Sequence, residues 1–283
     1  MKKFFITIFI VLQCFLFNGY LFAGKYYNSY DSIGNRRERK ESFLEKDGVL
    51  ECIVFLGFPS IIGFVFLIFY LRKKKIKDYC EKNYFIYEDY PISLTGSSES
   101  FDILTFGDSS HFSNGMYKQK GDIEINIVEY TTYKGLSKTG RRKSSYNYTL
   151  CQLYKKNVQF PAFSIREENA IFDFLGSMIG GQDIDFIEDK RFSDTFVLQG
   201  DCESEIRQFF GNKVRNSFTK YHKRGYYYEG KGSGFLLYVK GHVGINKKVE
   251  MLNTALRIFN DISSTGFVSS NLPKEEYRNP KYY

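Results

Sequence analysis

The feature that most constrains this chain is an uncharged apolar stretch followed at once by a run of cations. Residues 52–71 carry no charged side chain, and fourteen of these twenty residues are Ile, Leu, Val or Phe. At about 1.5 Å per residue, a helix of this length spans about 30 Å, which matches the hydrocarbon core of a bilayer. The stretch therefore predicts a transmembrane helix over 49–71, with a buried core helix as the alternative.

The cations that follow the stretch predict its orientation. Lys and Arg next to a membrane span stay on the cytoplasmic side, where they also face anionic lipid head groups. We therefore expect residues 78–266 to form a cytoplasmic domain at the inner membrane of a cell. The juxtamembrane run at 72–77 supplies the lipid-facing charge, through Arg72, Lys73, Lys74, Lys75 and Lys77.

The residues before the stretch divide into two segments. Residues 1–23 have a short basic start, an apolar centre and Ala23 at the end, which is typical of a secretory signal peptide. An uncleaved first membrane span is the alternative, and the sequence leaves both open. Residues 24–48 are polar and too short to bury a core, so they predict a short extracytoplasmic loop.

The charge of the remaining chain argues against nucleic acid as a partner. The whole chain has a formal charge of +8, yet residues 78–283 contain 27 Lys and Arg against 26 Asp and Glu, a net of +1. A nucleic-acid-binding domain usually keeps a basic excess of its own. The five cysteines form no C-x-x-C pair and no cluster with the three histidines, so no metal or other cofactor is expected.

Alternating apolar residues predict an antiparallel sheet in the first half of this domain. Ile123, Ile125 and Ile127 have the period of a strand, and 144–154 supplies a return strand, so the two form a long hairpin. A strand is also expected at 103–106, a turn-rich connection at 107–115, and a short strand at 160–163 that Pro161 would confine to a sheet edge.

The second half mixes helices with strands. Apolar residues from Ile171 to Ile179 follow a helical stripe, Asp201 is expected to cap a helix that runs to Tyr221, and Asn246 is expected to cap a last helix. Between the last two helices, 226–239 predicts a hairpin around Gly230–Gly234. This order predicts an α+β fold with a mainly antiparallel sheet and about three helices, followed by a flexible tail at 267–283.

The succession of short segments resembles a known family. The segments include Ser113-Asn114-Gly115, Val128-Glu129-Tyr130-Thr131-Thr132, Phe160-Pro161-Ala162-Phe163, Gln182-Asp183-Ile184-Asp185-Phe186 and Ile206-Arg207-Gln208-Phe209-Phe210. In order and spacing, over residues 100 to 262, they resemble a family of uncharacterised bacterial membrane-anchored proteins with a cytoplasmic domain. The resemblance implies one continuous domain at a bacterial inner membrane. It implies no activity and no catalytic residue.

Two places could carry chemistry, and each has a structural alternative. Gly107-Asp108-Ser109 is similar to the nucleophile block of GDSL-type lipases and esterases, but the Asp-x-x-His pair of that family is missing, which favours a plain turn. Asp183 and Asp185 belong to an acidic cluster that could bind a divalent cation or serve acid–base chemistry. Their alternation with Ile184 and Phe186 favours a solvent-facing position instead.

These observations favour a protein that is not an enzyme, with an enzyme as the alternative. The leading hypothesis is a membrane-tethered cytoplasmic domain that binds another protein or acts as a scaffold, with the lipid bilayer as its second partner. One alternative is a membrane-bound hydrolase that uses Ser109 or the Asp183 and Asp185 cluster. The other is a regulatory domain that responds to anionic lipid.

Overall fold

The computed structural model describes residues 58–91, 94, 101–135, 144–168 and 183–266. The chain divides into two compact units, residues 1–63 and 64–283. Of the first unit the structure describes only 58–63, which belong to a helix. The predicted segments 1–23, 24–48 and 267–283, and the predicted helix around 171–179, lie outside the described residues.

Helix α3 (Phe58–Asn83) overturns the prediction of a transmembrane helix. Within the part of the chain that the structure describes, no helix combines the length and the apolar content that crossing a bilayer requires. The uncharged part of α3 that the structure describes, 58–71, comprises 14 residues, or about 21 Å, and the cations follow it. Residues 49–57 of the predicted span lie outside the described residues. The prediction of a membrane-spanning protein loses its support together with the predicted helix. The predicted cellular location stays a prediction.

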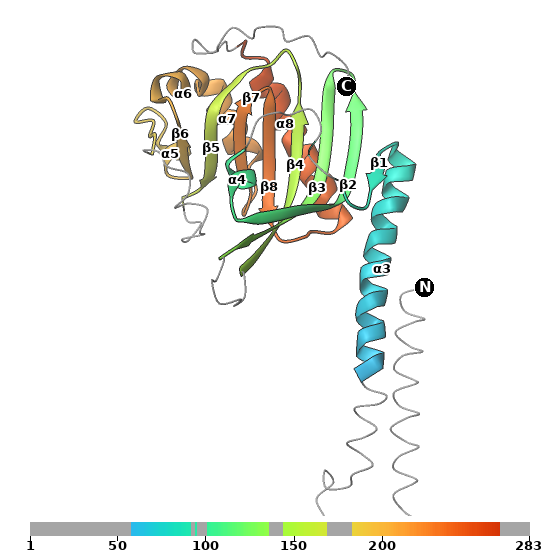
Figure 1. The fold of residues 1–283 in the computed structure, drawn as a ribbon. Helices are drawn as coiled ribbons and strands as arrows, with labels where there is room; N and C mark the ends of the chain where they lie inside the picture. Colours follow the sequence, from blue (N-terminus) through green and yellow to red (C-terminus); the bar gives the residue numbers. More distant parts are fainter. Residues whose placement is uncertain (1–57, 92–93, 95–100, 136–143, 169–182, 267–283) are drawn as a thin grey trace, which may run out of the picture. The chain divides into compact units, whose positions relative to one another are not determined.

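The centre of the second unit is one eight-stranded sheet in which every pairing is antiparallel. The order across the sheet is β1-β2-β3-β4-β8-β7-β5-β6 (Figure 1). The α+β class with an antiparallel sheet is therefore confirmed. The strands are β1 (Ile86–Glu88), β2 (Ser109–Lys120), β3 (Ile123–Lys134), β4 (Ser144–Tyr154), β5 (Phe160–Glu167), β6 (Phe196–Gly200), β7 (Tyr227–Gly232) and β8 (Gly234–Lys240).

Each face of the sheet buries its own apolar core, because successive side chains of a strand point to opposite faces. One core contains Ile125 and Ile127 of β3 together with Phe218 and Phe259 from the helices. The other contains Val128 of β3 and is covered by Phe101 and its neighbours. In Figure 1, α7 and α8 cross one face while α4 lies on the other. Apart from α3, the described helices are α4 (Asp102–Thr105), α5 (Lys190–Ser193), α6 (Glu203–Phe209), α7 (Asn212–Tyr221) and α8 (Ile245–Ser263).

The predicted hairpin is the most accurate part of the local predictions. Strands β3 and β4 pair without a register shift from Glu124 opposite Tyr154 to Lys134 opposite Ser144. The expected inward residues Ile123, Ile125 and Ile127 do pack in one core. The predicted strand at 103–106 is wrong, because 103–105 belong to the short helix α4 and Phe106 is its C-cap. The predicted turn at 107–115 is largely the first half of β2.

Two further predictions, the edge position of the strand with Pro161 and the single helix that ends at Tyr221, are wrong. Strand β5 lies between β7 and β6 rather than at an edge, and the sheet accommodates Pro161 at a register shift between Phe160 and Phe163. The helix expected from Asp201 to Tyr221 is two helices, with a break at Phe210 and Gly211.

Candidate functional site

The basic run at the end of the apolar stretch is built into the fold through Arg72. Its Nη2 donates to Oε1 of Glu129 at 2.7 Å and to the carbonyl oxygen of Val243 at 3.1 Å. Glu129 lies in the middle of β3, on the same face as Ile125 and Ile127, and its side chain is 1% exposed. The first residue after the apolar stretch therefore connects α3 to the centre of the sheet.

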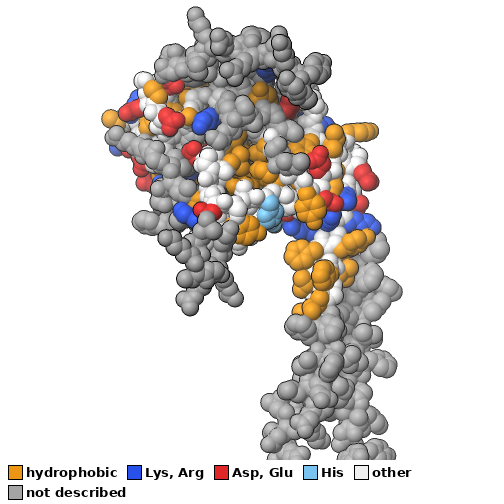
Figure 2. Space-filling model, in the orientation of Figure 1, with side chains coloured by type: hydrophobic (Ala, Val, Ile, Leu, Met, Phe, Trp, Pro, Cys, Tyr) orange, Lys and Arg blue, Asp and Glu red, His pale blue; other side chains and the backbone are white. Residues whose placement is uncertain are grey.

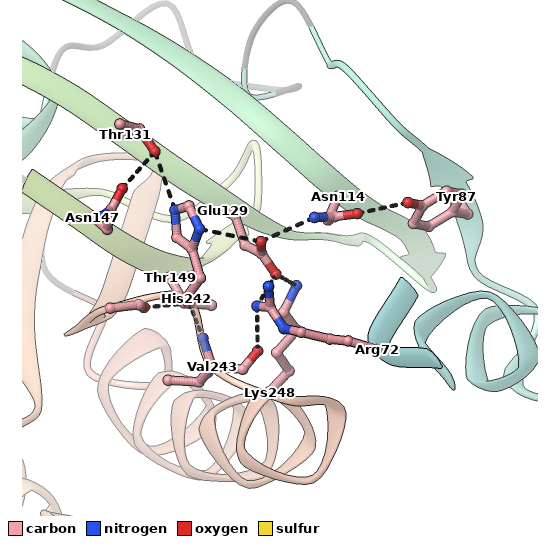
Figure 3. Close-up of polar contacts among 11 residues, drawn as sticks. Arg72, Tyr87, Asn114, Glu129, Thr131, Asn147, Thr149, His242, Val243 and Lys248 are labelled. Atoms are coloured by element: carbon pink, nitrogen blue, oxygen red, sulfur yellow. Dashed lines mark hydrogen bonds and ion pairs between the residues drawn. The ribbon is translucent and has the colours of Figure 1, made fainter. Parts of the chain in front are cut away.

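Glu129 collects polar partners from several elements, as Figure 3 shows. Nζ of Lys248, on α8, lies 2.8 Å from its Oε1, an ion pair outside hydrogen-bond geometry. Nδ2 of Asn114, on β2, donates to Oε2 at 3.0 Å, and Nδ1 of His242 lies 3.5 Å from the same oxygen. We call these five residues, Arg72, Asn114, Glu129, His242 and Lys248, the Glu129 cluster.

The loop before α8 is held in place so that His242 faces Glu129. The Thr149 hydroxyl, on β4, donates to the Gly241 carbonyl at 2.8 Å and accepts from the Val243 N–H at 3.0 Å. On the far side of the ring, Nε2 of His242 lies 3.2 Å from Oγ1 of Thr131. Backbone and side-chain hydrogen bonds thus fix the imidazole in one orientation.

Burial governs the electrostatics of the Glu129 cluster. Lys248 is fully buried, and desolvation lowers the pKa of its ammonium group, while the nearby Glu129 carboxylate opposes this shift. Desolvation also lowers the pKa of His242, and the negative charge of Glu129 again opposes this shift. Arg72 and Lys248 together carry two positive charges against the one negative charge of Glu129. The cluster is therefore already net positive, which disfavours protonation of the imidazole.

A more exposed set of contacts continues from Asn114 towards α3. The Tyr87 hydroxyl, on β1, lies 2.7 Å from Oδ1 of Asn114 and donates to Oδ1 of Asp89 at 2.6 Å. Asp89 also pairs with Nζ of Lys73 at 2.8 Å and lies 3.8 Å from Nζ of Lys77. The hydrogen bond from Lys73 is the main reason that the pKa of Asp89 is lowered.

The five cations predicted to face lipid therefore differ in their surroundings. Arg72 binds the buried Glu129, whereas Lys73 and Lys77 pair with Asp89 at the surface, and Lys77 also lies over the Tyr87 ring. Lys74 and Lys75 are exposed. Contact of these cations with lipid stays a prediction.

Residues 183–194 contain the predicted acidic cluster, and most of their contacts hold this segment against the rest of the fold. Asp183 and Asp185 are exposed while Ile184 and Phe186 are buried, as the alternation predicts. Asp183 accepts a hydrogen bond from Gln199 at 2.7 Å. Within the residues that the structure describes, no group of three or more His, Cys, Asp or Glu side chains is placed to hold a metal ion.

The ion-pair partner of the acidic side chains in this segment is Arg215. Arg215, on α7, pairs with Glu188 at 3.2 Å and with Asp189 at 2.9 Å. Its guanidinium also stacks over the Phe186 ring, 4.3 Å from the centroid. These contacts fasten the segment before α5 onto α7.

Ser109 is exposed at the start of β2, opposite Tyr133, and each of the three histidines contacts other residues. His111 stacks on Tyr133, His222 contacts Glu167 and Tyr228, and His242 belongs to the Glu129 cluster. A serine nucleophile needs a histidine base within hydrogen-bond distance. The hydrolase alternative therefore gains no geometric support at Ser109.

A polar cavity lies on the opposite face of the sheet, beside α4. Its volume is about 130 Å³, and Asp102, Ser164, Gln199, Asp201, Glu229 and Lys231 are among the residues that line it. Glu229 is 1% exposed and accepts the backbone N–H groups of Asp102 at 2.7 Å and Ile103 at 3.2 Å. Sequence reasoning missed both Glu129 and Glu229, although each is an acid directly preceded by apolar or aromatic strand residues.

These features define an α+β protein with a large antiparallel sheet, a separate core on each face and a buried glutamate on either side. No protein-family model matches the chain. No curated protein matches it either. Among solved structures it is similar to the crystal structure of the mycobacterial trehalose monomycolate transport factor A, TtfA, at 12% identity with a TM-score of 0.48, over 68% of this chain and 93% of that chain. A likeness of this degree carries no argument about function.

Proposed function

We propose that this protein is a non-enzymatic interaction domain that binds a partner protein through the apolar part of α3. One observation carries the proposal, namely the exposure of large apolar side chains just before the basic run. Val65, Phe66, Ile68, Phe69 and Tyr70 are between 44% and 70% exposed. We call these five residues the apolar segment of α3, and Figure 2 shows hydrophobic side chains gathered on this helix.

Exposed apolar side chains in this number favour a surface that another molecule covers. Burying one such side chain contributes about 1.5–3 kcal/mol, and contiguous exposed patches are rare on soluble monomers unless they bind something. Consecutive positions such as Val65 and Phe66 are both exposed, so the apolar surface extends around the helix. A helix that is apolar all round normally lies buried, which indicates that the partner surrounds much of the segment.

The charges next to the segment indicate the chemistry of the partner. Lys74 and Lys75 are exposed one turn beyond Tyr70, and Arg72 is held by Glu129. A partner that covers the segment and continues along the helix gains from acidic side chains opposite these two lysines. We therefore expect an apolar protein surface bordered by Asp or Glu.

The Glu129 cluster gives this binding mode a rigid base. Ile76 and Cys80 of α3 are buried in the sheet core, and Arg72 binds Glu129 within the same unit. A helix held at these points presents the apolar segment in a fixed orientation, which reduces the conformational entropy that association must overcome.

The experiment uses the full chain with a photoreactive amino acid at Phe66 and, as a matched control, at exposed Glu81 on the same helix. We expect a crosslink to one protein from Phe66 and not from Glu81. The captured protein, once purified, is expected to bind the full chain directly. Binding is expected to fall by at least about tenfold in a Phe66→Ser, Phe69→Ser double variant, since two buried aromatic side chains are lost.

Three outcomes would contradict the proposal. Crosslinks only to a second copy of this chain would indicate self-association. Crosslinks that arise equally from both positions would indicate non-specific contact. Binding of the purified chain to anionic vesicles, weakened by Lys74→Glu and Lys75→Glu, with no protein captured, would favour the lipid-responsive alternative.

A further inference from the structure

The cavity beside α4 contains a buried acid without a cationic partner. Glu229, on β7, contacts the backbone N–H groups of Asp102 and Ile103 and the hydroxyl of Tyr238. Among the residues that the structure describes, no Lys, Arg or His lies within ion-pair distance of its carboxyl group. An unpaired buried carboxylate costs several kcal/mol, so a group in this position takes up either a proton or a cation.

The surroundings of Glu229 favour the proton while the cavity holds no cation. Burial is the largest cause that raises the pKa of its carboxyl group to about 8, and the charge of Asp102 raises it further. The hydrogen bonds from Tyr238 and from the two backbone N–H groups act in the other direction. Burial also raises the pKa of Asp102, while the nearby Lys231 lowers it. Among the described residues, the charged ones that line this cavity are Asp102, Asp201, Glu229 and Lys231.

The size and lining of the cavity limit what it can hold. A volume of about 130 Å³ corresponds to about four water molecules, since each occupies about 30 Å³ in the liquid. Ser164 on β5 and Gln199 on β6 add a hydroxyl and an amide beside the carboxyl groups. A ligand of a few non-hydrogen atoms that donates several hydrogen bonds fits this description.

We propose that this cavity binds a small primary ammonium compound, with its charged nitrogen against the carboxylate of Glu229. An ammonium group has three donors and no acceptor, which suits a site of carboxyl, hydroxyl and amide oxygens. A hard metal ion suits it less, because Ca²⁺ takes six to eight oxygen ligands and both oxygens of Glu229 already accept backbone N–H groups. The ligand displaces the carboxyl proton to solvent, so one positive charge replaces another.

The binding partner of α3 and this ligand are independent, because the apolar segment and the cavity are built from different residues. The first test is calorimetric titration of the full chain with methylammonium chloride at pH 6, 7 and 8, with sodium chloride as the ionic-strength control. Methylammonium stays protonated throughout this range, so only the protein titrates. Affinity is expected to rise about tenfold between pH 6 and pH 7 and by less between pH 7 and pH 8, with one proton released per ligand at pH 6.

Variants then assign the site. Glu229→Gln is expected to lower the affinity for methylammonium at least tenfold, and Ser164→Ala by a smaller factor. Asp185→Asn, which removes an exposed carboxylate outside the cavity, is the matched control and is expected to change nothing. If Glu229→Gln does not fold, the pH dependence of the wild type and the Ser164→Ala variant still decide.

Four results would overturn the assignment. Two concern the folded wild type, namely no saturable binding of methylammonium at millimolar concentrations and an affinity that does not change between pH 6 and pH 8. The other two are an equal affinity in the folded Glu229→Gln variant and displacement of methylammonium by an equal concentration of sodium ions. A failed search for a partner of α3 would leave each of these measurements intact. The two proposals therefore stand or fall separately.

Discussion

Glu129 and Glu229 show two solutions to the same physical problem. Each is 1% exposed in a central strand of one sheet, β3 for Glu129 and β7 for Glu229. They point to opposite faces, because Glu129 shares its face with Ile127 whereas Glu229 faces α4. Glu129 has Arg72 and Lys248 as ion-pair partners, while the partners of Glu229 are backbone N–H groups and a tyrosine hydroxyl.

The difference shows what each acid can contribute. Opposite charges within 3 Å keep Glu129 tied to α3 and α8, so its carboxylate joins elements that are distant in sequence. Burial, followed by the charge of Asp102, raises the pKa of Glu229, whereas the hydrogen bonds from neutral donors orient its carboxyl group and only oppose this shift. The first acid therefore serves assembly of the fold, and the second is available to exchange a proton for a ligand.

The largest effect is expected from removing the charge of Glu129. Glu129→Gln leaves Lys248 buried without an opposite charge, and breaking a buried ion pair in this way costs about 3–5 kcal/mol in the free energy of unfolding. Urea denaturation of the variant measures the loss. Glu124→Gln on the same strand, where the side chain is partly exposed, is the matched control and is expected to change stability little.

Replacing both members of the pair distinguishes the charge from the packing. A double variant, Glu129→Met with Lys248→Met, is expected to recover much of the loss, because the fully buried Lys248 charge is removed with its partner, while Arg72 is 25% exposed and keeps its hydrogen bond to the Val243 carbonyl. A single variant as stable as the wild type would mean that the ion pair contributes nothing, and the contrast with Glu229 would then disappear.

The second effect concerns pH and belongs to Glu229. Its carboxyl has a folded pKa of about 8 against the usual 4.5, so the folded state holds the proton more tightly than the unfolded state does. Stability is therefore expected to fall as pH rises from 4.5 to 8, by about 1.4 kcal/mol per unit in the middle of that window. His242 has the opposite sign, since its lowered pKa removes stability as pH falls through the usual histidine range.

Unfolding at pH 6 and pH 7.5 separates these contributions. Glu229→Gln keeps His242, so the difference between its pH slope and that of the wild type isolates Glu229. Equal slopes in the two proteins would show that the carboxyl is not protonated in the folded state, and both glutamates would then be charged.

A smaller effect compares two neighbouring cations of α3. Arg72→Met removes a charged hydrogen bond to a buried carboxylate, whose loss costs about 1.5–3 kcal/mol, while Lys248 still compensates Glu129. Lys73→Met removes only a surface pair with Asp89, which contributes about 0–1 kcal/mol. Thermal unfolding of the two variants ranks them, and a Lys73 variant as destabilised as the Arg72 variant would contradict the ranking.

The sequence predicted the parts of this comparison that depend on neighbours in the chain. The β3–β4 hairpin follows from Ile123, Ile125 and Ile127, whose alternation is local, and the burial of Ile184 and Phe186 follows in the same way. The helix α4 was missed because Glu229, 127 residues away from Asp102, accepts its first N–H groups. The transmembrane prediction rested on hydropathy alone, which carries no information on the contacts that join the rest of α3 to the sheet through Arg72 and Ile76.

The candidate sites were missed for a related reason. Arg72 and Glu129 are 57 residues apart, and in the sequence Arg72 is one of five similar cations whose different partners have no local signal. In the sequence, Glu129 and Glu229 look alike as acids among strand-forming residues. Only the pairing of strands and the packing of α3 and α8 decide which acid receives cations.

The smallest expected effect tests the neutral donors around Glu229. Tyr238→Phe removes a hydroxyl that hydrogen-bonds the Glu229 carboxyl and lowers its pKa, so the pKa of Glu229 is expected to rise further. Loss of one such bond costs about 0.5–1.5 kcal/mol, and the pH at which the fall in stability levels off should move above 8. Tyr226→Phe removes a hydrogen bond to the more exposed Glu250, so it is the matched control and should leave that pH unchanged. A downward shift of that pH with Tyr238→Phe would mean that the hydroxyl stabilises the protonated form of Glu229. The donors around Glu229 would then not explain why it differs from Glu129.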